Sequence, residues 1–169
     1  MSYKILKHIE MSLDPSSIDH AINEIKHFRS ELIKTCNDLI RELTEQGVEI
    51  AKMQVTALDA VDTAELENNI AGVFFPAERI GVVYTPTPYA LFVEYGTGVV
   101  GDGTYPGETA NGWKYDYNDH GTEGWIYKND RDGQYYWTMG YVARPFMYST
   151  LEWLREAAPE IAKKYFDQM

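Results

Sequence analysis

Residues 88–98 read PYALFVEYGTG, an apolar run that holds one carboxylate, Glu94, and closes on a glycine turn. The side chain of Thr87 can accept a hydrogen bond from the free N–H groups of a first helical turn, and the proline after it suits the first helical position. Gly96 suits the position just after a helix, where a positive φ is common. We therefore predict a short helix over residues 89–95. A strand remains an alternative, because seven residues do not separate the two hydrophobic periods.

Glu94 needs a partner if it is buried, because an unpaired carboxylate in an apolar environment costs free energy. Arg144, in the stretch VARPF at 142–146, also lies in an apolar setting just before a predicted helix. We predict an ion pair between Glu94 and Arg144 that joins the short helix to the C-terminal helix. The alternative is that Glu94 acts as a general acid. A lone carboxylate without a base or nucleophile in any motif is weak evidence for catalysis.

A long amphipathic helix is predicted upstream of this stretch. Asp14 can cap its first turn, and the proline that follows fits the first helical position. Gly47 interrupts the pattern, so we expect a kink or a brief break there before the helix continues to about Leu58. A helix of that reach spans on the order of 60 Å, so either the break folds it back or part of its apolar face meets another subunit. The apolar positions recur three, four or seven residues apart and are Ile18, Ile22, Ile25, Leu32, Cys36, Leu39 and Leu43.

The other segments complete an α+β domain. Residues 59–69 are polar and predict a loop with a capped turn that starts at Asp62 or Thr63. Pro159 should bend the last helix. The remaining predicted elements are a short strand at 3–11, paired strands at 70–75 and 79–84, a hairpin of 125–127 with 134–137 across a turn that ends at Gly133, and a helix at 149–166.

We therefore expect one domain over residues 1–169. A long N-terminal helix and a C-terminal helix pack on a small, mostly antiparallel sheet, and an aromatic hairpin is inserted at about 99–138. A chain of 169 residues is long enough for one sizeable core and short for two domains.

The composition excludes several classes of function. A formal charge of −11 repels phosphate backbones and anionic lipid headgroups, so neither a broad nucleic-acid surface nor membrane binding is expected. Cys36 is the single cysteine, which rules out an internal disulfide, and its place in the apolar stripe predicts a buried thiol. The N-terminal stretch has no apolar run of signal-peptide length, and no segment has the length of a membrane span, so we expect a cytoplasmic protein.

No motif assembles a catalytic, cofactor or metal site. The acidic loop at 128–139 fails the calcium-loop pattern because Met139 stands where a glutamate is needed. Asp116, Asp119 and His120 form only a loose oxygen-rich cluster, and the four histidines lack zinc-site spacing. Nucleophile-elbow and phosphate-loop motifs are missing from the sequence. We expect a protein that is not an enzyme and that uses no cofactor or metal.

Aromatic residues gather in the insertion. Flat amphipathic rings could stack on sugars or contact a protein partner, whereas cross-strand pairs that hold the hairpin together are the structural alternative. We expect a mixture, with some rings paired across strands and others facing a neighbouring subunit. The candidates for partner contact are Trp113, Trp125, Tyr127, Tyr136 and Trp137.

Three ordered blocks resemble a known family. They are AK at 51–52 with DTAEL at 62–66 and NI at 69–70, then PYALFVEYGTG, then ARPFM at 143–147. In this order and spacing the chain, over about residues 20–165, resembles the putative tail-component family of tailed bacteriophages, typified by a neck protein of a Hong Kong lambdoid phage. The resemblance marks as structural motif residues Tyr89, Ala90, Glu94, Gly96, Thr97, Arg144, Pro145 and Phe146.

The resemblance implies a non-enzymatic virion or prophage assembly protein. It would act at the head-tail junction or the proximal tail end, as a tail-completion or head-tail joining component. Its partners would be copies of itself in a ring and other neck or tail proteins, with DNA passing through without specific binding. It would be made in the host cytoplasm and end in the virion.

The sequence departs from the family pattern twice. Ala64 stands where the family usually has glycine, so we expect that this turn does not need positive φ. The insertion at 99–138 is longer than a minimal member requires. An alternative function of another class is a small carbohydrate- or peptidoglycan-binding module that uses the tryptophans and tyrosines of the hairpin.

Overall fold

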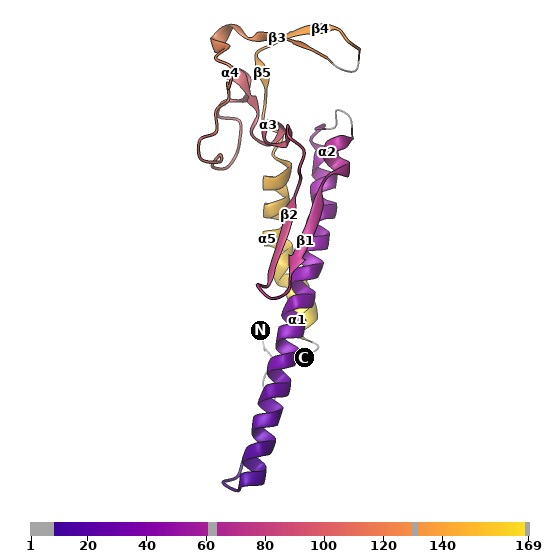
Figure 1. The fold of residues 1–169 in the computed structure, drawn as a ribbon, viewed down its shortest axis with the longest axis vertical. Helices are drawn as coiled ribbons and strands as arrows, with labels where there is room; N and C mark the ends of the chain where they lie inside the picture. The colour runs from indigo at the N-terminus through magenta and orange to yellow at the C-terminus, as the bar shows by residue number, and fades with distance from the viewer. Residues whose placement is uncertain (1–8, 61–63, 130–131, 168–169) are drawn as a thin grey trace.

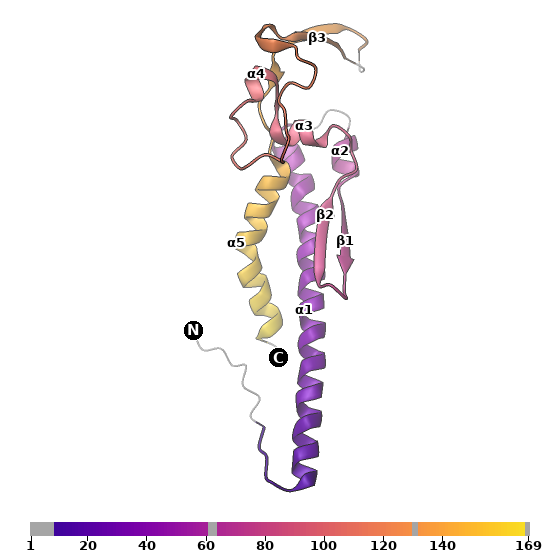
Figure 2. The same ribbon diagram turned by 60° about the vertical axis from the view of Figure 1, so that its left-hand side comes forward.

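A computed structural model describes residues 9–60, 64–129 and 132–167. The molecule is elongated, with one long helix as its axis, a shorter helix and a two-stranded ribbon beside it, and a loop-rich region at one end (Figures 1 and 2). The fold is α+β as expected, with two separate two-stranded antiparallel sheets. The predicted strand at 3–11 lies largely outside the described residues, and residues 9–11 form no strand.

The axis is helix α1, Pro15–Ala57, which is continuous. Asp14 caps it as predicted, accepting from the Ser17 backbone N–H at 2.9 Å. The expected interruption at Gly47 is wrong. A Cβ at this buried glycine would lie 2.9 Å from Val83 Cγ2 and 3.3 Å from Leu154 Cδ1. Gly47 therefore marks the point where two other elements pack against α1, and that packing outweighs the cost of about 1 kcal/mol for glycine inside a helix.

A ribbon of β1 (Ala71–Phe75) and β2 (Ile80–Tyr84) packs along α1, and its antiparallel pairing confirms the predicted strands. Gly72 and Gly81 lie on the face toward the helix. A Cβ on Gly72 would come within 3.0 Å of the Thr44 side chain, and one on Gly81 would overlap the Thr44 hydroxyl. The two glycines thus allow the ribbon backbone to approach the helix closely.

The turn before the ribbon differs from expectation. Helix α2, Glu65–Asn68, follows Ala64, which adopts a left-handed φ of 59°. We expected that this turn would not need positive φ, yet Ala64 takes it, although a residue with a Cβ is disfavoured there by about 1 to 2 kcal/mol. Asp62 and Thr63, the predicted caps of this turn, lie outside the described residues.

Helix α5, Phe146–Phe166, lies antiparallel along the second half of α1 (Figure 2). It begins at Phe146, ahead of the predicted Ser149, and contains Pro159. Near its other end, the Tyr165 hydroxyl donates to Glu42 Oε2 at 2.6 Å, a bond that raises the pKa of Tyr165 to about 12. Each end of α5 is therefore attached to the rest of the fold by a bond to a carboxylate, as the site below shows for the first end.

The loop-rich end carries the remaining elements (Figure 1). Strands β3 (Trp125–Lys128) and β4 (Tyr135–Thr138) form the predicted hairpin, which extends away from the helices, with Gly133 at a φ of 71° in its turn. Within the described residues, no helix combines the length and apolar composition of a membrane span. The elements here are α3 (Ala90–Tyr95), α4 (Gly98–Gly101), a 3₁₀ turn (Gly121–Glu123), β3 (Trp125–Lys128), β4 (Tyr135–Thr138) and β5 (Gly140–Tyr141).

Replacing Gly81 with alanine tests the close approach of the ribbon to α1. We expect Gly81→Ala to lower the free energy of unfolding by about 1 to 3 kcal/mol, because the added methyl group overlaps the Thr44 hydroxyl. Thr44→Ala removes that hydroxyl, so the double variant should lose less stability than the sum of the two single variants. Chemical denaturation of all four proteins measures this coupling. Purely additive losses would contradict the predicted contact.

Candidate functional site: the junction around Glu94

The three sequence blocks meet in one core. Ala51 from the first block is fully buried on α1, and Phe146 from the third block is buried at the start of α5. Between them lie Ala90 and Val93 of the PYALFVEYGTG stretch. The core cluster of the described residues is Ala51, Val55, Ala60, Leu66, Ile70, Ala90, Val93 and Phe146. The residues that carry the resemblance are therefore largely those that hold the fold together.

Glu94 lies at the centre of this junction, with only 5% of its surface exposed. Its Oε2 accepts from the Met147 backbone N–H at 2.9 Å, and its Oε1 accepts from the Tyr148 backbone N–H at 2.9 Å. The Tyr105 hydroxyl donates to Oε1 at 3.3 Å. Both carboxylate oxygens are thus engaged, which accounts for the burial of this charge.

The two backbone donors belong to the first turn of α5. A helix leaves its first N–H groups without intrahelical partners, and a side chain just before the helix usually satisfies them. Pro145 occupies that position in α5 and makes no side-chain cap bond. Glu94, which lies on α3 and 53 residues before Met147, caps α5 instead. Its negative charge also complements the positive end of the α5 dipole.

The predicted ion pair between Glu94 and Arg144 is wrong. Among the described residues these two side chains form no ion pair, and Arg144 contributes through its backbone instead. Its N–H donates to the Val93 carbonyl at 2.8 Å, and its carbonyl accepts from the Phe146 N–H at 2.8 Å. The N-terminus of α5 supplies the positive electrostatic partner of the carboxylate. Glu94 therefore does not need the Arg144 guanidinium.

Burial and hydrogen bonding act on the Glu94 carboxyl in opposite directions. Burial raises the pKa of Glu94 above its ordinary value of 4.5, whereas the bonds from Met147 and Tyr148 oppose the rise. Burial, and then the nearby Glu94 charge, raise the pKa of Tyr105 well above the usual range, so its hydroxyl remains a donor. Tyr105 was not singled out in the sequence, because a tyrosine in a loop gives no signal that it faces a carboxylate 11 residues away.

The start of α3 also differs from the prediction. The helix begins at Ala90 after Tyr89, and Thr87 provides its backbone carbonyl rather than its side chain, accepting from the Ala90 N–H at 3.1 Å. The Thr87 hydroxyl instead lies within 3.3 Å of Asn69 Nδ2 and 3.1 Å of the Thr85 hydroxyl. Thr87 is therefore a buried link to the first sequence block, and its predicted role as a side-chain cap is wrong.

The glycine turn after α3 brings two distant segments together. Gly96 has a φ of 81°, as predicted for the end of this helix. A Cβ there would lie 2.8 Å from the Ala143 nitrogen and 2.8 Å from the Tyr141 carbonyl oxygen. Thr97 forms a β-bridge with Tyr141. The turn thus holds residues 140–145, which lead into α5, against the end of α3. Only glycine permits this close approach.

The aromatic residues of the insertion divide into packed and open rings. Trp113 packs against Phe92 and Tyr95 of α3, at centroid distances of 5.4 and 4.9 Å, and so attaches the insertion to the junction. Trp125 stacks on the His120 ring at 4.6 Å.

On the hairpin, Tyr127 and Tyr136 form a cross-strand pair with centroids 6.0 Å apart. Trp137 is 61% exposed, although its Nε1 donates to the Glu123 carbonyl at 3.1 Å. Of the five candidates for partner contact, Trp137 therefore presents the most open ring.

No cluster of side chains in the described residues offers a metal centre. Asp116 accepts from His120 Nδ1 at 3.0 Å and from the Gly121 N–H at 2.8 Å; against the opposing effect of burial, such bonds lower the pKa of Asp116 to about 2. In the described ranges, no three histidine, cysteine or acidic side chains are placed to hold a metal ion. Cys36 is a half-buried free thiol.

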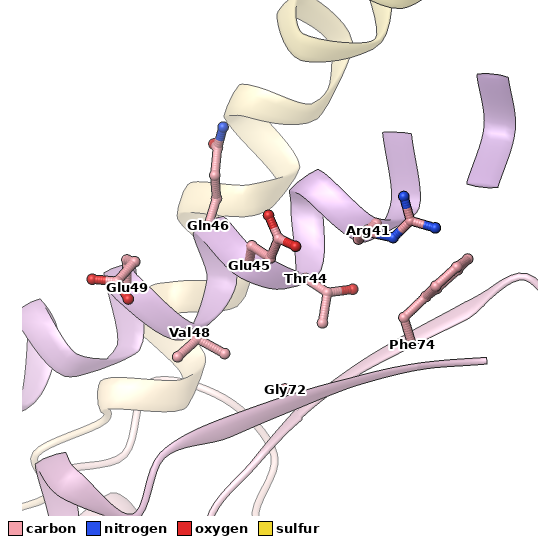
Figure 3. Close-up of a pocket in the computed structure, with 8 residues that line it drawn as sticks. All are labelled: Arg41, Thr44, Glu45, Gln46, Val48, Glu49, Gly72 and Phe74. Carbon is pink, nitrogen blue, oxygen red and sulfur yellow. The ribbon is translucent and has the colours of Figure 1, made fainter. Parts of the chain in front are cut away.

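Two open grooves flank α1 and the junction. One, of about 410 Å³, lies between α1 and β1, where Arg41 stands 5.3 Å from the centre of the Phe74 ring (Figure 3). The other, of about 650 Å³, lies between β2, α3 and α5 and borders Glu94, but its lining is mainly apolar. Neither places a nucleophile or a free base beside Glu94, whose two oxygens already have partners.

Comparisons with known proteins identify no relative. The chain matches no protein-family model, and neither a similar characterised sequence nor a similar solved structure was found.

Replacing Glu94 with glutamine tests the capping role. We expect Glu94→Gln to lower the free energy of unfolding by about 1 to 3 kcal/mol, because the amide has one acceptor oxygen for two buried N–H groups and turns a donor toward one of them. Arg144→Gln is the matched control and should change stability by less than about 0.5 kcal/mol, because it leaves every bond to Glu94 intact. Thermal or denaturant unfolding of both variants measures the difference. If both variants lost the same free energy of unfolding, an ion pair between Glu94 and Arg144 would be the better explanation.

Proposed function

We propose that the chain is a structural subunit of a tailed phage or prophage, acting as a homo-oligomeric ring at the head-tail junction or the proximal tail end. In this role it would complete the tail or join it to the head, without enzymatic activity. The proposal begins from the resemblance of the three sequence blocks to the tail-component family. It is supported by the surface that the single chain leaves uncovered.

The size of that surface carries the proposal. The chain exposes 11877 Å², whereas a compact monomer of 19.4 kDa exposes about 8,500 Å². Within the described residues, ten apolar side chains form the buried core, and more than twice as many large apolar side chains are exposed. A soluble monomer rarely leaves so much apolar surface in contact with water. An assembly of several copies would cover it.

The role of Glu94 supports a structural function over an enzymatic one. A catalytic carboxylate needs an oxygen that is free to exchange a proton with a substrate. Both oxygens of Glu94 accept bonds that hold α5 and the insertion in place. The one carboxylate of PYALFVEYGTG thus acts as a helix cap.

The charge of the chain fits a ring through which DNA passes. At −11, each subunit contributes a negative field that repels the phosphate backbone. A ring of such subunits would let DNA move through without binding it. Other neck or tail proteins would be the partners at its two faces, and the protein would assemble in the host cytoplasm before it enters the virion.

The assembly state tests this proposal. We expect the purified protein to form a closed homo-oligomer, alone or with tail or connector proteins, because the exposed apolar surface needs a cover. Light scattering measures the mass, and negative-stain electron microscopy shows whether the particles are rings. A protein that stays monomeric even with those partners present would count decisively against a ring.

A carbohydrate-binding module is the second candidate, favoured by the open face of the hairpin. Tyr135 and Trp137 are exposed side chains of β4, and flat open rings of this kind stack on sugars. If this function holds, peptidoglycan fragments or other glycans should shift the tryptophan fluorescence, and Trp137→Ala should abolish the shift. A titration with no change in fluorescence removes this candidate.

A further inference from the structure

The outer face of the β1–β2 ribbon is almost entirely apolar. Strand residues alternate between faces, so the face away from α1 carries Ala71, Val73, Phe75, Ile80, Val82 and Tyr84, which pair with one another across the two strands. Four of these side chains are exposed, and Ile80 is 50% exposed. We call this surface the ribbon face. Its one polar group is the Tyr84 hydroxyl and it carries no charge, whereas an antiparallel sheet that borders water normally has polar residues on its outer side.

A second apolar surface lies on the first half of α1. This half extends beyond the ends of both α5 and the ribbon (Figures 1 and 2). Its apolar side chains recur at helical spacing along one side, and Ile25 is 57% exposed. The opposite side carries polar residues such as Asn23 and Ser30. We call this surface the helix stripe, and it consists of Ile22, Ile25 and Leu32, which are all exposed; Ala21 beside them is buried and marks its edge.

The two surfaces cannot meet within one chain. The ribbon is packed on the second half of α1, where Gly81 adjoins Ile40 and Thr44. Because α1 is continuous, Ile25 lies about 28 Å along the axis from Thr44, at 1.5 Å per residue. The helix stripe can therefore reach a ribbon face only if that face belongs to another copy.

The two surfaces match in length and in charge. The helix stripe spans about 15 Å at 1.5 Å per residue, and a five-residue strand spans about 17 Å. Residues 15–34 of α1 contain three acidic and three basic side chains, and residues 71–84 contain only Glu78 and Arg79. Both surfaces are thus formally neutral on a chain that carries −11 overall, so like-charge repulsion does not oppose their contact.

We propose that the helix stripe of one copy packs on the ribbon face of the next copy. The partner is a second copy because both surfaces belong to this chain, match in length and cannot meet within it. Two different patches are in contact, so each copy has one free patch of each kind, and repeated addition closes a ring when the rotation permits. This inference rests on the proposed ring and names the surfaces that would form it.

A pair of single substitutions tests the contact. Ile25→Glu places a carboxylate in the helix stripe, and Val82→Glu places one in the ribbon face; each should abolish the assembled species in light scattering. Both side chains are exposed in the single chain, so circular dichroism and thermal melting should show an intact fold. Asn23→Glu, on the polar side of the same helix, and Ala77→Glu, in the ribbon turn, add the same charge and should assemble like the wild type.

Mixing the two disabled variants identifies the surfaces that pair. The Ile25→Glu protein keeps an intact ribbon face, and the Val82→Glu protein keeps an intact helix stripe. The mixture should therefore form dimers of one copy of each, and nothing larger. Pairing of stripe with stripe predicts instead that Val82→Glu assembles by itself and that mixing adds nothing, which would overturn the inference.

The remaining outcomes separate this inference from the proposed function. If the wild type forms an oligomer and both variants assemble equally well, the contact lies elsewhere and only the present inference fails. If the wild type remains monomeric with its tail or connector partners present, the proposed ring and this contact both fail.

Discussion

The capping of α5 by Glu94 is the interaction on which the rest of the structure depends. The carboxylate comes from α3, its two backbone donors belong to the first turn of α5, and the Tyr105 hydroxyl that completes its bonding comes from the insertion. One buried side chain thus connects three segments that are far apart in the sequence. Its charge is tolerated because the helix N-terminus supplies partners for both oxygens. With α5 begun at this point, its 21 residues lie along α1 and end beside Glu42.

Glycine determines how the other elements pack on α1. Gly47 on the helix and Gly72 and Gly81 on the ribbon have no side chain where the backbones approach, so the ribbon lies close to the helix and Val83 packs at Gly47. The ribbon contributes Val83 to the margin of the core, and most of its apolar side chains lie on the outer face. These outward-facing side chains add to the large accessible surface of the chain. The ribbon and α5 each pack on α1, and much apolar surface remains available for contact with other molecules.

The pattern of hydrophobic residues predicted most elements correctly and their connections poorly. Periodicity located α1, the two hairpins and α5, because each is a local property of consecutive residues. The partner assigned to Glu94 was wrong, because the anion-binding N–H groups of a helix N-terminus belong to the backbone and are not specified by any residue type. Gly47 and Thr87 were assigned the local roles of a helix interruption and a cap, whereas tertiary packing uses both differently. Ala64 takes positive φ despite its Cβ, so the geometry of the turn outweighs the local preference.

The sequence by itself determined the fold class, the long helix, the paired strands and the requirement that Glu94 find a partner, since these follow from hydrophobic period, turn chemistry and the cost of burying charge. Only the tertiary structure decided which partner that is, and which apolar side chains remain outside the core. Both depend on distances between residues that lie far apart along the chain, as Glu94 and Met147 do. A linear pattern shows that a side chain is apolar or charged, but burial is a property of what folds against it.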